Sequence, residues 1–194
     1  MDISKEEARD SLDQIQAMAT RTRLTIAAGY DSGLLIMWGF VWITAFLGTH
    51  YFRTWAWYIW MVLAGIGSAV TFVVCWNQFR TGKPTKTPAA QKIGWRIFWF
   101  WSLLIVYIFI WLSILRPYRA IQVNAFICTA IMFAYVVSGL WFKSYYMLWL
   151  GLFVTCITMA GFYLIPPSYY CLWMAPTGGG AFLTTGLFIR FRWR

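Results

Sequence analysis

The chain has 194 residues, of which 61% are hydrophobic and 21% aromatic, whereas only 11% are charged. A soluble domain carries about 25% charged residues, so this composition excludes an ordinary soluble protein and indicates an integral membrane protein. The formal net charge is +10. We attribute it to basic residues at helix ends and expect no nucleic-acid partner, because no solvated basic surface is predicted.

Residues 1–29 predict a cytosolic amphipathic helix. Ser4 and Glu7 have the spacing of a capping box, in which each side chain satisfies a free backbone amide of the other residue. An apolar stripe follows at helical spacing. The stripe either packs on the protein's own membrane domain or the bilayer surface, or it binds a second subunit or a cytosolic partner. Its members are Leu12, Ile15, Ala19 and Ile26.

Residues 30–194 predict a six-helix transmembrane domain that ends in a short basic tail. Each apolar run is close to the ~20 residues that a helix needs to cross a bilayer. We therefore expect an all-α integral membrane protein with six transmembrane helices, arranged as three successive hairpins. The expected spans are residues 30–51, 55–79, 95–115, 120–142, 145–165 and 169–189.

The distribution of basic residues predicts the orientation. The N-terminal segment, residues 80–96, Lys143 and the tail together hold 13 of the 16 Lys and Arg residues. Cytosolic loops are enriched in Lys and Arg, so both termini are expected on the cytosolic side. The membrane is expected to be a cell (inner or plasma) membrane. The same basic face is expected to attract anionic lipid.

Two offsets of the chain against itself suggest an internal repeat with pseudo-threefold symmetry. A hairpin repeat of this kind places equivalent helices around an axis along the membrane normal. The offset of 63 residues aligns Trp38 with Trp101 and Arg53 with Arg116, and the offset of 113 aligns Gly65 with Gly178 and Gly67 with Gly180.

The last apolar run contains an unusual group of helix-disfavouring residues. Proline lacks an amide donor, and glycine lets another backbone approach closely. The group is therefore either a solute or ion pathway lined by free carbonyls, or a surface on which helices pack. It consists of Pro176, Thr177, Gly178, Gly179 and Gly180, with a similar set at Gly65, Gly67 and Ser68.

Two further residues stand at the ends of the first span. Asp31 is placed to cap the helix, and His50, the only histidine, lies at the opposite end. Each could instead line the entrance of a pathway. A single histidine does not suffice for the usual metal or haem ligation.

After Asp31 the chain contains no carboxylate, and no catalytic set or nucleotide-binding motif is present. We therefore expect no enzyme activity, cofactor or metal, and no proton-coupled transport. The leading hypothesis is a small uncoupled channel or facilitator for a solute or ion, working alone or as a homo-oligomer. The alternative is a membrane-embedded sensor or scaffold that docks a cytosolic partner through its N-terminal helix.

Overall fold

The computed structural model describes residues 32–81, 88–115, 119–142 and 144–192, and within these ranges it contains helices and no strand. Five of the helices are long and apolar enough to cross a membrane. The last long helical segment, Tyr170–Arg192, is divided by a π-helical turn. The prediction of an all-helical, multi-pass membrane protein is therefore confirmed at this level.

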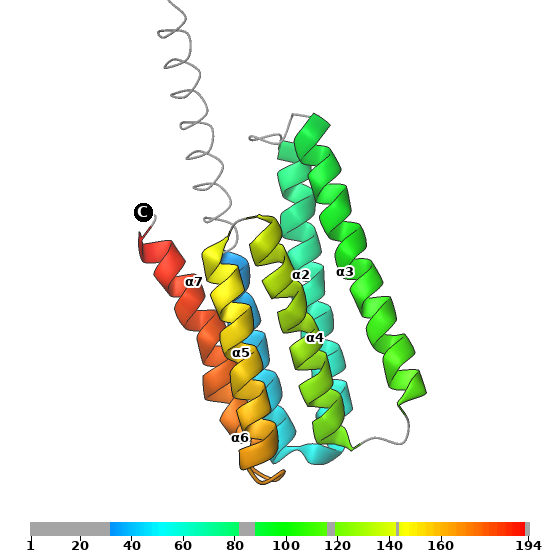
Figure 1. The fold of residues 1–194 in the computed structure, drawn as a ribbon, viewed down its shortest axis with the longest axis vertical. Coiled ribbons are helices and arrows are strands. Elements are labelled where there is room, and N and C mark those ends of the chain that lie inside the picture. The colour runs from blue at the N-terminus through cyan, green and yellow to red at the C-terminus, as the bar shows by residue number, and fades with distance from the viewer. Residues whose placement is uncertain (1–31, 82–87, 116–118, 143, 193–194) are drawn as a thin grey trace, which may run out of the picture.

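The long helices lie side by side in one bundle (Figure 1). The described part of the first helix covers Ser32–Tyr51. It is followed by the 3-10 turn η1 (Arg53–Trp55), α2 (Ala56–Thr81), α3 (Pro88–Ile114), α4 (Ala120–Trp141), α5 (Tyr145–Leu164), α6 (Tyr170–Met174), the π-helical turn η2 (Ala175–Gly179) and α7 (Gly180–Arg192).

The largest difference from the expected boundaries concerns the connection between the second and third spans. Helix α2 continues to Thr81 and α3 already begins at Pro88, rather than at Trp95. Proline suits the first helical position because its missing amide has no partner there and its φ is already helical. The apolar run therefore underestimates the length of α3, because the first two turns of this helix precede the run.

Glycines bring neighbouring helices close together in one part of the molecule. A Cβ on Gly139 of α4 would lie 2.6 Å from the Leu148 nitrogen of α5, and one on Gly151 of α5 would lie 2.8 Å from the Met132 oxygen of α4. A Cβ on Gly161 of α5 would similarly lie 2.6 Å from the Trp173 ring of α6. Helices α4, α5 and the last helix thus form a close-packed unit.

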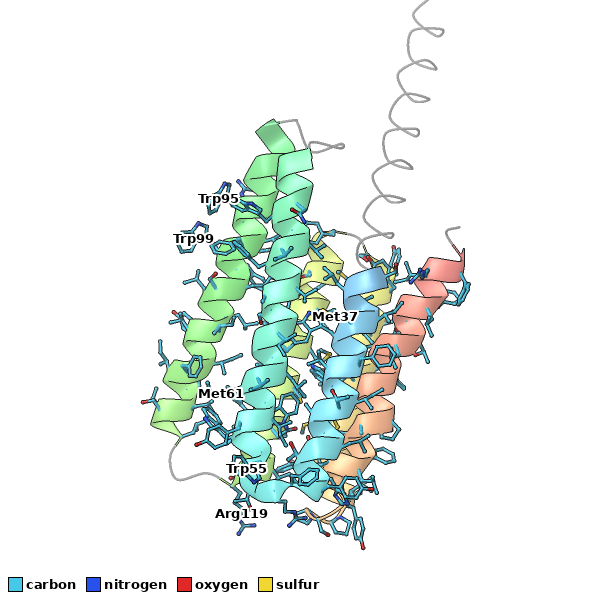
Figure 2. All side chains as sticks on the ribbon, turned by 180° about the vertical axis from the view of Figure 1, so that it is seen from behind. Met37, Trp55, Met61, Trp95, Trp99 and Arg119 are labelled. Atoms are coloured by element: carbon cyan, nitrogen blue, oxygen red, sulfur yellow. The ribbon has the colours of Figure 1, made fainter. Side chains whose placement is uncertain are left out.

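Helices α2 and α3 lie at the periphery of this unit (Figure 2). Only 6% of the apolar window of each is buried, against 39% for the first helix. Helix α3 contacts α4 through aromatic pairs, with ring centroids 5.6 Å apart for Phe100 and Trp141 and 5.9 Å for Trp101 and Tyr135. The other sides of these two helices are largely exposed.

Candidate functional site

The helix-disfavouring residues of the last helix form η2, a π-helical turn between α6 and α7. Pro176 cannot donate to the carbonyl four residues earlier, so an α-helical hydrogen bond is lost there. The Thr177 hydroxyl donates to the Trp173 carbonyl at 2.6 Å. A π turn replaces i→i−4 bonds by i→i−5 bonds. The helix therefore continues through this segment instead of breaking.

Gly179 lies where the last helix crosses the first helix. A Cβ on Gly179 would be 2.5 Å from Ile43 Cγ1 and 3.2 Å from the Gly39 oxygen. The relation is reciprocal, because a Cβ on Gly39 would be 3.1 Å from the Gly179 oxygen. Both helices therefore need glycine at this crossing.

A second close contact lies farther along the same pair of helices. A Cβ on Gly186 would be 2.7 Å from Ile36 Cγ1 and 2.9 Å from the Ser32 oxygen. Gly186 follows Gly179 by two helical turns, so one glycine face of the last helix packs along the first helix.

The remaining residues of the predicted site have different surroundings. Gly178 is buried, and a Cβ there would be 3.5 Å from the Trp42 ring. A Cβ on Gly180 would have nothing within 4 Å, and Pro176 is exposed. Only the inward side of the turn therefore contacts the first helix.

The similar set in α2 is arranged differently. A Cβ on Gly67 would lie 3.1 Å from the Trp38 ring of the first helix, whereas one on Gly65 would have nothing within 4 Å. Ser68 is exposed. The aligned glycines therefore do not share one environment, since Gly65 is open where Gly178 is buried. The internal repeat stays a prediction.

Most hydroxyl groups in the spans are satisfied within their own helix. In six of the helical segments a threonine or serine donates to the carbonyl four residues earlier, at 2.6–2.9 Å. Thr71 also accepts a bond from the Trp38 indole nitrogen, at 3.2 Å. These hydroxyl protons are therefore not presented to a solute.

Of the two predicted entrance residues, the structure describes only His50. Asp31 lies outside the described residues. The His50 ring makes an edge contact with Tyr51, with centroids 5.0 Å apart. Its Nδ1 is buried and has no hydrogen-bond partner within the described ranges. At the same end of the bundle, the Arg53 guanidinium donates to the Ser168 carbonyl at 3.2 Å, which ties η1 to the start of the last helix.

The predicted partner-binding stripe, Leu12, Ile15, Ala19 and Ile26, also lies outside the described residues. Among those that are described, no group of three or more His, Cys, Asp or Glu residues could hold a metal ion.

Buried polar side chains form a small set near α4 and α6. The Tyr170 hydroxyl is buried and has no hydrogen-bond partner in the described part of the chain. The Cys128 thiol donates to Asn124 Oδ1 at 3.6 Å within α4. These groups add polarity to the buried core.

Sequence reasoning missed the partners on the first helix, Gly39, Trp42 and Ile43. One signal was available, because Ser32 and Gly39 are seven residues apart, as are Gly179 and Gly186. Two small-residue stripes of equal period can pack against each other. The sequence does not say which helices meet.

We found no match for this chain among protein families, curated proteins or solved structures.

Proposed function

We propose that the protein is a membrane-embedded sensor or scaffold that docks a cytosolic partner through its N-terminal segment. The observation that carries this proposal is the packing at η2. Gly179 is in van der Waals contact with the first helix, and the space of a single added methyl group is already occupied. A solid helix crossing at the most unusual segment of the chain supports a structural role for that segment.

The local hydrogen bonds of the hydroxyl groups support the same proposal. A water-filled path needs polar groups that face it, as in channels lined by carbonyls or hydroxyls. Here the Thr158 hydroxyl, which is fully buried, donates to the Val154 carbonyl of its own helix at 2.7 Å. Thr177, at the π turn, does the same with Trp173.

In this proposal both termini are cytosolic in a cell (inner or plasma) membrane, and the basic residues hold the protein against anionic lipid. The N-terminal stripe is then presented to a soluble partner. Helices meet such partners through an apolar face at i, i+3, i+4 and i+7 spacing.

The docking role is tested with the double variant Leu12→Asp, Ile15→Asp. We expect the wild-type protein, purified from its native membrane, to retain a specific cytosolic protein in a pull-down assay. The double variant should not retain that protein. The matched control is Gln14→Asp with Ala17→Asp, which adds the same charges on the opposite side of the predicted helix. Equal recovery of that partner by the double variant would overturn the docking role.

A small uncoupled facilitator is the second candidate, and the π turn itself favours it, because π turns are frequent at functional sites. Solute flux into proteoliposomes separates the two. If the protein is a sensor or scaffold, vesicles that contain the wild-type protein should be no leakier than protein-free vesicles across a panel of small neutral solutes and ions. Flux that needs no coupling ion and that falls in Gly179→Leu, but not in Gly180→Leu, would establish the facilitator instead.

A further inference from the structure

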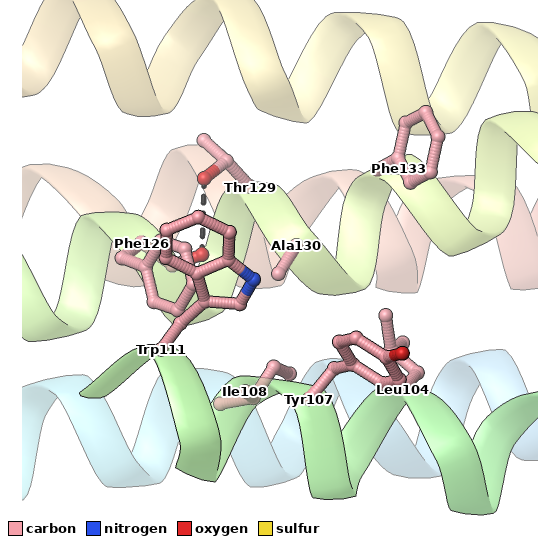
Figure 3. Close-up of a pocket in the computed structure, with 8 residues that line it drawn as sticks. All are labelled: Leu104, Tyr107, Ile108, Trp111, Phe126, Thr129, Ala130 and Phe133. Carbon is pink, nitrogen blue, oxygen red and sulfur yellow. Dashed lines mark hydrogen bonds between the residues drawn. The ribbon is translucent and has the colours of Figure 1, made fainter. Parts of the chain in front are cut away.

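A groove of about 300 Å³ runs between α3 and α4. Four residues from each helix line it, from Leu104 to Trp111 on α3 and from Phe126 to Phe133 on α4 (Figure 3). It lies beyond the Trp101–Tyr135 contact that holds α3 against α4. The two helices thus touch toward one end and leave a gap toward the other.

The lining of the groove is aliphatic and aromatic. Its one aliphatic hydroxyl belongs to Thr129, and that group lies 2.9 Å from the Ala125 carbonyl and 3.0 Å from the Phe126 carbonyl of its own helix (Figure 3). The hydroxyl proton is therefore already used. Tyr107 and Trp111 add a phenol and an indole N–H to the otherwise apolar wall. Such a wall suits a hydrocarbon ligand better than a hydrated solute.

The groove lies at the depth of the hydrocarbon core. Phe126 and Phe133 follow Arg119, the residue that precedes α4, by seven and 14 positions. At 1.5 Å per residue, the groove extends from about 10 Å to about 21 Å below Arg119. Half of a bilayer's hydrocarbon core is about 15 Å thick, so the groove spans the level of lipid acyl chains.

The groove is open toward the bilayer, because its lining residues Tyr107 and Phe133 are 59% and 62% exposed. Acyl chains of the surrounding lipid therefore reach it directly.

Arg119 supplies a positive charge about 10 Å above the near end of this groove. It is exposed at the end of the bundle where α4 begins (Figure 2), and its backbone amide donates to Gln122 Oε1 at 2.9 Å. All six acidic residues of the chain fall within positions 2–31, so the described residues offer it no carboxylate. A guanidinium is well suited to bind phosphate through paired hydrogen bonds.

We propose that the α3–α4 groove binds one acyl chain of an anionic phospholipid whose phosphate is held by Arg119. The positive charge of Arg119 and the apolar wall about 10 Å below it match the two parts of such a lipid. The inference extends the proposed function by naming the ligand that the bundle senses, and its test requires no protein partner.

Occupancy of the groove is tested by photolabelling the purified full chain in detergent micelles with a phosphatidylglycerol that carries a diazirine in its acyl chain. We expect peptide mapping to place the label at residues 104–111 and 126–133. Ala130→Trp fills the groove and should reduce this labelling about tenfold, which corresponds to about 1.4 kcal/mol. The matched control is Ala69→Trp, at an exposed position of α2, which should label as the wild type does.

The headgroup is tested by competition against the same probe with unlabelled lipids. Phosphatidylglycerol should compete about tenfold better than phosphatidylcholine, and Arg119→Gln should remove this preference while leaving the labelled peptides unchanged. Arg96→Gln, at an exposed arginine near the opposite end of α3, is the control that should keep the preference.

Label spread evenly over all spans, or equal labelling of Ala130→Trp and the wild type, would overturn the proposed site. If Ala130→Trp does not fold, Ala130→Leu is the milder filler and the wild-type label map remains decisive. Equal competition by the two lipids would overturn the role of Arg119. Groove labelling in a protein that recovers no cytosolic partner would contradict the proposed function alone.

Discussion

The first helix and α3 are both apolar membrane spans, yet 39% of the first is buried and only 6% of α3. Hydrophobicity does not explain the difference, because α3 has the higher mean hydropathy, 2.3 against 1.6. In a bilayer the lipid is as apolar as the side chains, so helix association depends on close packing. The first helix carries Gly39 and Gly48, whereas Trp95–Ile114 contains neither glycine nor alanine.

The comparison shows which residues position helices in this protein. Where glycine is present and matched, as at Gly39 and Gly179, backbones approach closely. Where large aromatic residues take its place, as on α3, the helix contacts its neighbour through ring edges and leaves a groove. Substitution of a glycine at a close helix contact should therefore destabilise the protein, whereas substitution of a glycine that faces open space should not.

The largest effect is expected for Gly139→Ala between α4 and α5. The new Cβ would lie 2.6 Å from the Leu148 nitrogen and 2.9 Å from its Cα, so a backbone would have to move. Overpacking of this kind costs about 1–3 kcal/mol, even though alanine favours a helix by about 1 kcal/mol. The free energy of unfolding, measured by titration with sodium dodecyl sulfate, should fall accordingly.

The control for that variant is Gly65→Ala, where the new Cβ has nothing within 4 Å. Here the helix preference of alanine acts alone, so stability should stay equal or rise by up to about 1 kcal/mol. A loss at Gly65 equal to that at Gly139 would contradict the packing account.

A smaller loss is expected for Gly179→Ala at the π turn. The new Cβ would be 2.5 Å from Ile43 Cγ1, a side-chain atom that can move in part, and 3.0 Å from the Ile43 nitrogen. The melting temperature in detergent should fall, whereas the neighbouring Gly180→Ala, with nothing within 4 Å, should leave it unchanged. Equal melting temperatures for both variants would show that the first and last helices are not closely packed at Gly179.

The smallest effect is expected at the contact of the first helix with α2. Trp38→Phe removes the indole donor to Thr71 Oγ1, and Thr71→Val removes the acceptor. Interhelical hydrogen bonds in membranes average about 0.6 kcal/mol. A double-mutant cycle on the free energy of unfolding should give a coupling of about that size, and additive effects would mean that the bond contributes nothing.

The sequence predicted the parts of this fold that follow from local composition. Long apolar runs indicated the spans, and Pro176 with its glycines indicated where the last helix departs from regular geometry. It did not predict that Pro88 starts α3, because the first turns of that helix are not apolar. Pairing between distant helices, such as Gly39 with Gly179, depends on three-dimensional approach and is not encoded in any local pattern.

The candidate site shows the same limit. The sequence marked η2 and left open whether its residues line a path or pack. That choice depends on Ile43 and Trp42, which lie more than a hundred positions away in the chain. The α3–α4 groove gave no sequence signal, because its lining has the ordinary composition of a membrane helix.

The π turn changes the angular phase of the last helix. In a regular α-helix each residue advances by about 100°, so an apolar face keeps one direction along the helix. A wider turn resets that phase. The last helix contacts α5 on both sides of the turn, and before it the Trp173 indole donates to the Ile157 carbonyl of α5 at 3.3 Å. Beyond the turn, Gly186 also meets Ile36 of the first helix. A single helical wheel drawn through Tyr170–Arg192 would therefore assign the residues beyond the turn to the wrong side of the helix.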